Sequence, residues 1–178
     1  MIILSLGSNL SSNLNHSRFE NINNALSSLY ENGFKKVRKS NFYETPSYPD
    51  KTKPKFINII ISLEYNGKKK NINVLDHLIF LIFDIENKAG RIRTKKNDPR
   101  VIDIDIIDYN NQVIDYKKED LPEIKIPHEK ASTRNFVLFP LKEICPNWKH
   151  PQTDEDIDKL IDKLSESDKK SILMVEYN

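Results

Sequence analysis

Hydrophobic and polar residues alternate along the chain with the period of a strand in some segments and the period of a helix in others. An apolar run over residues 2–6 predicts a buried strand, which ends in a Gly-Ser-Asn turn at residues 7–9. Helical spacing over residues 19–29 predicts an amphipathic helix, and the Asn-Gly pair at residues 32–33 marks its end. A second strand is predicted over residues 37–43.

The middle of the chain continues with the same kinds of element. Residues 45–54 contain three prolines and predict a loop. The β-branched residues of segment 56–65 predict a strand that ends at the Asn-Gly pair 66–67. Residues 74–89 predict an amphipathic helix that ends at Gly90.

The last predicted strand comprises residues 101–109, and an Asn-Asn pair turns it into residues 112–114 as a hairpin. Thr153 is expected to cap a helix whose apolar face lies within residues 157–164. The order βαββαβ, with a hairpin and C-terminal helices added, predicts an α+β fold with helices packed on a mainly antiparallel sheet. Ferredoxin-like is the closest named architecture. Because this architecture supports many functions, the function has to be inferred from individual residues.

Composition and charge narrow the class of protein. A chain of 178 residues, 38% of them hydrophobic, is long enough for one buried core, and we expect residues 1–178 to form a single domain. The net charge of +2 gives no reason to expect a nucleic-acid or membrane partner. The single cysteine, Cys145, cannot form an internal disulfide, and no apolar run reaches the roughly 20 residues of a membrane span. The apolar residues 2–6 are too few for a signal peptide, so we expect a cytoplasmic protein. We also expect a monomer.

The most informative segment, residues 90–106, contains three arginines followed by an Asp-Ile-Asp triplet. Because side chains alternate between the faces of a strand, Asp103 and Asp105 are expected on one face and the neighbouring isoleucines in the core. Two carboxylates at this spacing can hold one or two Mg²⁺ ions that bind phosphate oxygens. The arginines are Arg91, Arg93 and Arg100. Their guanidinium groups suit a polyphosphate, so the segment contains the groups that phosphoryl-type transfer requires.

The same segment also fits a half-exposed strand with an acidic face beside a solvated basic loop. Other candidate chemistry is weaker: His128 and Arg134, taken alone, fit a surface turn, and Cys145 has no evident base. Ser8 lacks the G-x-S-x-G context of a hydrolase nucleophile. The sequence has no Walker A motif and no glycine-rich kinase loop, so an ATP site has to be of another type.

Short motifs occur in a fixed order between residues 4 and 141. They are residues 6–10 (Leu-Gly-Ser-Asn-Leu), 42–46 (Phe-Tyr-Glu-Thr-Pro), 56–58 (Phe-Ile-Asn), Glu86 with 90–93 (Gly-Arg-Ile-Arg), 99–105 (Pro-Arg-Val-Ile-Asp-Ile-Asp), 126–128 (Ile-Pro-His) and 134–141 (Arg-Asn-Phe-Val-Leu-Phe-Pro-Leu). Each motif is short, but their joint order is highly specific. In this order the chain resembles the 6-hydroxymethyl-7,8-dihydropterin pyrophosphokinase family of folate biosynthesis.

The resemblance implies transfer of pyrophosphate from ATP to the pterin alcohol, giving AMP and the pterin pyrophosphate. Asp103 and Asp105 would bind two Mg²⁺ ions between ATP and the pterin hydroxymethyl oxygen. Arg91 and Arg100 would contact phosphates around the transition state. ATP would thus be the co-substrate and Mg²⁺ the cofactor.

The resemblance also implies both substrate sites. The nucleotide side would comprise Glu86, Arg93, Arg100, His128 and Arg134. Thr45, Pro46 and Asn58 would bind the hydrogen-bonding edge of the pterin. Phe56 and Phe136 would enclose its ring; without the resemblance, both would be expected to pack in the core.

The chain departs from the family pattern at several positions. The loop between residues 93 and 100 is one residue shorter than in familiar members, and Asn97 and Asp98 replace an aromatic residue and a glycine. The other departures are Phe83, Glu123, Lys125 and Glu129. Any effect of these changes is expected on nucleotide contacts and loop closure, whereas the metal pair, Arg91 and Arg100 match the family pattern.

Two alternatives belong to other classes. Another Mg-NTP nucleotidyl-transfer enzyme on a ferredoxin-like fold would also present paired aspartates, but it would not need the Thr-Pro motif or Asn58. A non-enzymatic RNA-binding module would need exposed aromatic residues on two central strands and a stronger basic face, neither of which is evident. The expected partners are therefore the small molecules ATP and pterin, with no nucleic acid and no membrane.

Overall fold

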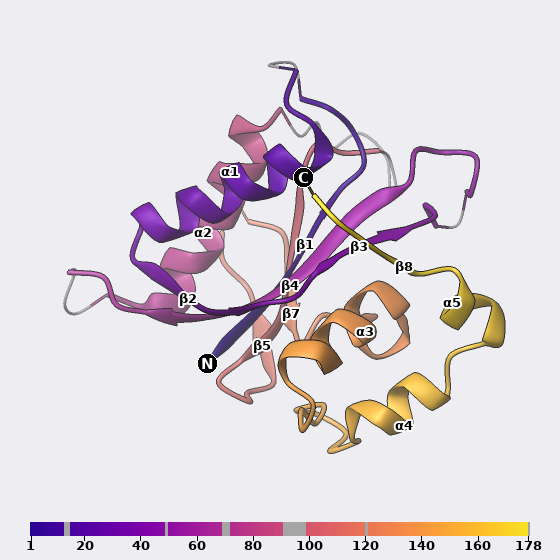
Figure 1. Ribbon diagram of the computed structural model, residues 1–178. Coiled ribbons are helices and arrows are strands. Elements are labelled where there is room, and N and C mark those ends of the chain that lie inside the picture. The colour runs from indigo at the N-terminus through magenta and orange to yellow at the C-terminus, as the bar shows by residue number, and fades with distance from the viewer. Residues whose placement is uncertain (13–14, 49, 69–71, 91–98, 120, 178) are drawn as a thin grey trace.

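A central strand, β1 (Ile2–Ser8), lies between β4 (Phe56–Tyr65) and β5 (Asp103–Tyr109) and pairs antiparallel with both. The computed structural model describes residues 1–12, 15–48, 50–68, 72–90, 99–119 and 121–177 (Figure 1). The other edge of β4 pairs in succession with β2 (Phe34–Lys39) and β3 (Phe42–Thr45), again antiparallel. The order β5-β1-β4-β3 matches the βαββαβ topology expected from the sequence, and the ferredoxin-like prediction is confirmed.

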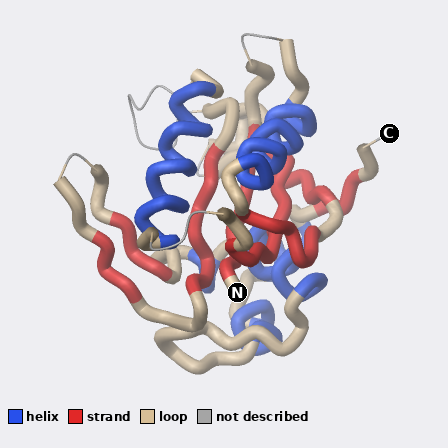
Figure 2. The backbone as a smooth tube through the Cα atoms, turned by 90° about the vertical axis from the view of Figure 1, so that its left-hand side faces the viewer, coloured by secondary structure: helices blue, strands red, loops and turns tan. Residues whose placement is uncertain are grey.

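Helices cover both faces of this sheet (Figures 1 and 2). One face packs against α1 (Arg18–Glu31) and α2 (Val74–Lys88), in a core that includes Leu4 and Ile104. The other face packs against α3 (Asn135–Ile144) and α4 (Ile157–Asp162). After α4, the short helix α5 (Glu166–Lys170) leads to β8 (Leu173–Val175), which pairs with β3 at the edge of the sheet.

The two long helices begin and end where local chemistry favours it. Ser17 caps α1 in a reciprocal arrangement with Glu20: each side chain accepts a hydrogen bond from the other residue's backbone N–H. Asn73 caps α2 with a single bond, in which its Oδ1 accepts the N–H of Asp76. Gly33 and Gly90 follow the two helices with φ of 90° and 83°, a conformation that glycine adopts without a Cβ penalty. Among the described residues, no helix is long and apolar enough to cross a membrane.

Three local predictions are wrong. The strand predicted over residues 37–43 is split into β2 and β3 at Ser40, whose side chain accepts the N–H of Ile60 in place of a ladder bond. The expected hairpin partner of β5 is β6 (Ile114–Tyr116), which pairs instead with β7 (Ile124–Ile126) in a separate two-stranded sheet.

The third wrong prediction concerns the cap of α4. The helix begins at Ile157 after Asp156, and Thr153 lies in a preceding turn in which its N–H donates to the carbonyl of His150. The sequence also gave no signal for α3, which contains Pro140 in its interior. Its apolar residues, like those of α4, are buried because they pack on the sheet.

Candidate active site

Two cross-strand rows of side chains define one face of the sheet. In the first row, Asp103 lies opposite Gly7, and Gly7 lies opposite Asn58. In the next row, Asp105 lies opposite Ser5. Residues that face one another across an antiparallel ladder project from the same side. Both aspartates therefore share a face, as the alternation of the sequence predicts.

Packing identifies this face as the one toward α3. Ile104 and Ile106 belong to the core beneath α1 and α2, so their neighbours on β5 point the other way. Farther along the sheet, Ile3, Ile60 and Ile107 pack with the apolar residues of α3. The carboxylates lie where this apolar packing gives way to polar residues, and their side chains are 24% and 25% exposed.

Each carboxylate has its own cationic partners. Those of Asp103 and Asp105 come from different parts of the chain. Nη1 of Arg100 donates to Oδ2 of Asp103 at 3.0 Å. Nη1 of Arg134 donates to Oδ2 of Asp105 at 3.2 Å, and Nε2 of His128 lies 3.8 Å from the same oxygen. These charge-assisted contacts hold cationic side chains beside both carboxylates.

The orientation of the histidine follows from its second nitrogen. Nδ1 of His128 accepts the backbone N–H of Lys130 at 3.0 Å, so the other ring nitrogen, Nε2, holds the proton and faces Asp105. The structure thus brings together five of the residues selected from the sequence. They are Arg100, Asp103, Asp105, His128 and Arg134. Arg91 and Arg93, with Asn97 and Asp98, lie outside the described residues.

A second group of selected residues lies on the same face, beside the first row. Nδ2 of Asn58 donates to Oγ1 of Thr45 at 3.0 Å and to the carbonyl of Tyr43 at 3.3 Å. Asn58 and Thr45 are each 3% exposed. Thr45 lies opposite Phe56 in the β3–β4 ladder, so the amide, the hydroxyl and a half-buried aromatic ring are adjacent. Pro46 follows β3 and is also half-buried.

Gly7 leaves space beside this polar group. A Cβ at this position would lie 3.1 Å from Oδ1 of Asn58 and 3.5 Å from Cδ1 of Phe56. Phe136 lies in the first turn of α3, half-buried, with the Arg134 guanidinium carbon 5.3 Å from its ring centroid. It comes from the helix layer, whereas Phe56 comes from the sheet.

Glu86 occupies a different environment from the other nucleotide-side residues. It is 2% exposed, and its Oε1 accepts the N–H of Ile104 at 3.0 Å. Since β5 is the edge strand, this carboxylate satisfies a backbone donor that lacks a neighbouring strand. The described part of the structure therefore assigns Glu86 a bond that fixes α2 to β5.

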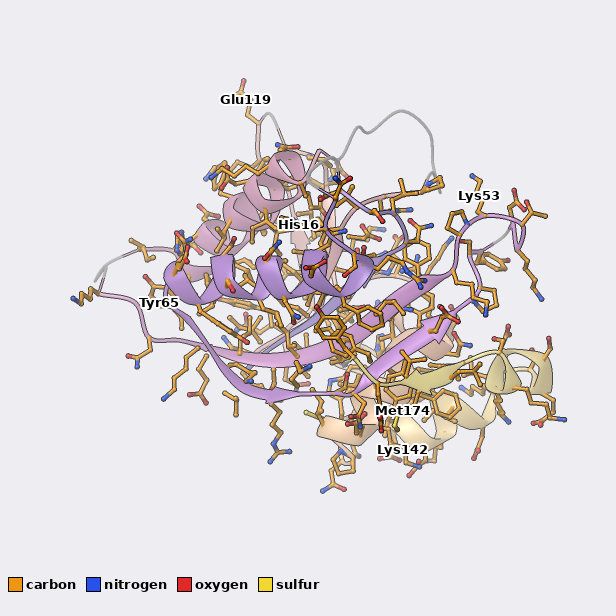
Figure 3. All side chains as sticks on the ribbon, turned by 45° about the horizontal axis from the view of Figure 1, so that its top comes forward. His16, Lys53, Tyr65, Glu119, Lys142 and Met174 are labelled. Carbon is orange, nitrogen blue, oxygen red and sulfur yellow. The ribbon has the colours of Figure 1, made fainter. Side chains whose placement is uncertain are left out.

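Sequence reasoning missed the role of Asn9, which joins the two groups. Its Oδ1 accepts the N–H of Arg100 at 2.7 Å, and its own N–H donates to the Arg100 carbonyl at 3.2 Å. Its Nδ2 donates to the carbonyl of Pro54 at 3.1 Å and to Ser47 at 3.3 Å, both in the loop after β3. Figure 3 marks this loop by Lys53. The signal in the sequence was an asparagine directly after a buried strand, which in the structure includes Gly7 and Ser8.

Tyr43 borders the polar group and is held in its neutral form. Burial, reinforced by the hydrogen bond that its hydroxyl donates to Glu143 at 2.9 Å, raises the pKa of Tyr43 to about 12. The hydroxyl is therefore a hydrogen-bond donor and not a base at neutral pH.

The donor set suits a hard divalent cation that also binds substrate. Within the described ranges, no cluster of three or more acidic, histidine or cysteine side chains could hold a metal by itself. Two partly exposed carboxylates on one strand face match the way Mg²⁺ is bound through one or two carboxylates together with water and phosphate oxygens. The residues present thus fit Mg²⁺ bound jointly by protein and nucleotide.

Comparisons with known proteins agree on one family. Residues 3–146 match the family model described as 7,8-dihydro-6-hydroxymethylpterin-pyrophosphokinase. The 2-amino-4-hydroxy-6-hydroxymethyldihydropteridine pyrophosphokinase of Aquifex aeolicus is 32% identical over 84% of this chain and 83% of its own length. The folic acid synthesis protein FOL1 of Dictyostelium discoideum is 37% identical over 85% of this chain. The chain spans about a fifth of the length of the first curated relatives it matches.

A solved structure supports the fold. A Plasmodium falciparum HPPK-DHPS double mutant crystallised with pterin and p-hydroxybenzoate superposes with a TM-score of 0.71 and 16% sequence identity. The match covers 99% of this chain and 47% of that one. At this identity the likeness concerns the arrangement of helices and strands alone.

Proposed function

The chain belongs to the 7,8-dihydro-6-hydroxymethylpterin-pyrophosphokinase family, and from this premise we propose that it transfers pyrophosphate from ATP to 6-hydroxymethyl-7,8-dihydropterin in folate biosynthesis. The products are AMP and the pterin pyrophosphate. The observation that supports this most directly is the pair Asp103 and Asp105, each with a guanidinium partner, on the same sheet face as the buried Asn58–Thr45 pair.

We assign Asp103 and Asp105 as the residues that hold two Mg²⁺ ions together with ATP. When bound, Mg²⁺ neutralises phosphate charge and favours ionisation of a hydroxyl group in its coordination shell. The β1–β5 ladder fixes the backbone positions from which the two side chains project.

The arginines bind and neutralise the triphosphate. Arg100 and Arg134 already lie beside the carboxylates, and each can reorient toward a phosphate that binds there. Arg91 and Arg93 are proposed for the same group from the sequence alone. His128, with Nε2 toward Asp105, is a further donor on the nucleotide side, and Glu86 is proposed near the adenosine. Such prearranged charges stabilise a transition state in which negative charge spreads over the phosphoryl oxygens.

The pterin is oriented by the polar group beside Gly7. Asn58, Thr45 and the backbone at Pro46 are proposed to bind its amide edge. Phe56 and Phe136 are proposed to enclose the ring from the sheet and helix layers, which favours flat stacking. This arrangement directs the hydroxymethyl group toward the carboxylate pair, next to Gly7 in the same row.

The reaction is a direct displacement. The pterin hydroxyl oxygen attacks the β-phosphorus of ATP, the bond from that phosphorus to the α,β-bridging oxygen breaks, and AMP leaves. The hydroxyl proton is released in the same step, and no covalent intermediate with the protein is required. Arg100 and Arg134 neutralise the charge that develops on the phosphate oxygens.

We further propose that residues 1–178 act as one domain, as a monomer in the cytoplasm. The chain's single cysteine fits a reducing compartment.

The test is to incubate the protein with ATP, Mg²⁺ and the pterin alcohol and to separate the nucleotide products. Formation of AMP that depends on the pterin is expected. ADP would indicate single phosphoryl transfer, and free pyrophosphate would indicate nucleotidyl transfer; either product in place of AMP refutes the proposal.

A further inference from the structure

The sheet face that carries Asp103, Asp105 and Asn58 is the proposed substrate face. A cluster of three charged residues lies on the opposite side of the sheet. Nη1 and Nη2 of Arg18, the first residue of α1, both lie 3.3 Å from Oε1 of Glu44. Nζ of Lys55 lies 2.9 Å from Oε2 of the same carboxylate. Nη1 of Arg18 also donates to the backbone carbonyl of Lys55 at 2.7 Å. We refer to Arg18, Glu44 and Lys55 as the rear clamp.

The rear clamp is attached to the pterin-side residues through the backbone. Glu44 immediately precedes Thr45, and Lys55 immediately precedes Phe56. Thr45 and Phe56 lie opposite each other in the β3–β4 ladder. Because side chains alternate along a strand, Glu44 and Lys55 project toward α1, while Thr45 and Phe56 project toward the substrate face.

Arg18 is well fixed for such a role. The reciprocal cap between Ser17 and Glu20 defines where α1 begins, so the base of the arginine side chain is held by the helix. The side chains of Arg18 and Glu44 are 30% and 20% exposed, and that of Lys55 is 54% exposed. The hydrogen bond from Lys55, with the charges of both cations, keeps the pKa of Glu44 below its ordinary value, so the carboxylate is ionised in the folded protein.

The contact with the Lys55 carbonyl distinguishes this cluster from an ordinary surface ion pair. It fixes a main-chain atom at the junction between the proline-containing loop and β4, one residue from Phe56. On the other side of that junction, Asn9 holds the carbonyl of Pro54. The segment that enters β4 is thus restrained from both sides, and Arg18 is the restraint on the side of α1.

We infer that Arg18 is a positioning residue for the pterin site, acting through the Lys55 carbonyl and Glu44 on the Thr45–Phe56 pair. The inference rests on the proposed function. Arg18 touches neither substrate; it sets the backbone position from which Phe56 and Thr45 meet the pterin.

The test compares Arg18→Met with wild type. Methionine keeps the unbranched stem and leaves Glu44 paired with Lys55, so no carboxylate loses its last partner. The KM for the pterin is expected to rise about 3- to 10-fold, the range for loss of one ordinary hydrogen bond, because Arg18 acts through the backbone and contacts neither substrate. The KM for ATP is expected to stay within about twofold of the wild-type value. Arg18→Lys retains the charge and a donor and is expected to recover most of the pterin affinity.

A matched control is Lys163→Met, which also replaces a cationic side chain with methionine. It removes the ion pair between Lys163 and Glu155 at the end of α4. It is expected to leave both KM values unchanged. Hydrogen exchange of the peptide spanning residues 55–58 adds a readout without turnover, and faster exchange is expected in Arg18→Met than in the control.

The outcomes separate the two proposals. If wild type forms no pterin-dependent AMP, the proposed function fails. If wild type is active and Arg18→Met has a wild-type pterin KM, or loses ATP and pterin affinity equally, the positioning role is wrong. A lower melting temperature with unchanged KM would assign Arg18 to stability alone and would also overturn the inference.

Discussion

Arg134 donates from Nη1 to Oδ2 of Asp105 at 3.2 Å, which joins the residue before α3 to the substrate face of β5. Arg100 makes the equivalent contact with Asp103 at 3.0 Å. Without substrate, each carboxylate of the pair is therefore balanced by a guanidinium. If a polyphosphate binds at this face, as proposed, it meets two arginines that already lie beside the carboxylates, so little rearrangement is needed.

The first prediction concerns the carboxylate pair. Asp103→Asn and Asp105→Asn should each lower kcat by about 10³-fold or more, because the loss of one anionic ligand weakens binding of the Mg²⁺ that neutralises the phosphates. Circular dichroism should be unchanged, since both side chains are partly exposed. Asp115→Asn, on the exposed part of β6, is the control. Near-wild-type turnover in both site variants would exclude the assignment of the metal pair.

The second prediction concerns Arg100. Arg100→Ala should lower kcat/KM by about 10²-fold or more, comparable to the loss of a transition-state charge contact of roughly 3 kcal/mol. Lys68→Ala, an exposed residue after the turn at the end of β4, should change kcat/KM by less than about twofold. Steady-state kinetics with both substrates varied provides the comparison, and equal effects of the two substitutions would argue against a catalytic arginine.

The third prediction concerns Phe136. Phe136→Ala should weaken pterin binding by about 2–4 kcal/mol, from lost stacking and lost apolar contact area, and should affect ATP binding less. Calorimetric titration with pterin and a non-hydrolysable ATP analogue measures both affinities. Phe80→Ala, which removes an exposed ring from α2, should leave them unchanged. A wild-type pterin affinity in Phe136→Ala would show that Phe136 does not enclose the pterin ring.

The fourth prediction uses the space beside Gly7. In Gly7→Ala the new Cβ would lie 3.1 Å from Oδ1 of Asn58, so the amide has to move by a few tenths of an ångström. We expect the pterin KM to rise about tenfold, because the amide is proposed to bind the pterin edge, and the melting temperature to fall only slightly. A loss confined to the ATP KM would contradict this placement of the pterin.

The fifth prediction concerns the pH dependence of stability. His150 is 6% exposed, and burial lowers its pKa below the ordinary value of about 6.5. Its Nδ1 accepts the N–H of Gln152, so the folded protein holds the neutral ring. The unfolded state binds the proton more readily, so the stabilising contribution is complete above about pH 6.5 and is lost as the pH falls toward the folded-state pKa.

The melting temperature of wild type should therefore decline between about pH 7 and pH 5. His150→Asn retains an acceptor in place of Nδ1 and should flatten this part of the profile, whereas His16→Asn, ahead of α1, should retain the wild-type slope. Parallel profiles for wild type and His150→Asn would show that other groups cause the decline.

Local patterns in the sequence determined much of the core and the main chemistry. The strand predicted over residues 56–65 has the bounds of β4, and the helices α1 and α2 begin and end within two residues of the predicted positions. Asp103 and Asp105 share a face because alternation along a strand requires only the local backbone geometry. Capping residues and Asn-Gly turns likewise act over a few residues, so they can be recognised without knowledge of the fold.

Only the tertiary structure decided which distant segments meet. No local feature distinguishes β7 from β5 as the partner of β6, or predicts that Arg18 reaches the Lys55 carbonyl. Asn9 contacts a residue 91 positions away, and Arg134 one that is 29 positions away. These contacts depend on how the sheet packs between its two helix layers, where burial of apolar surface from distant segments stabilises one arrangement over others. The period of hydrophobic residues specifies which side of each element is buried, but the partner of that side is selected only when the layers assemble.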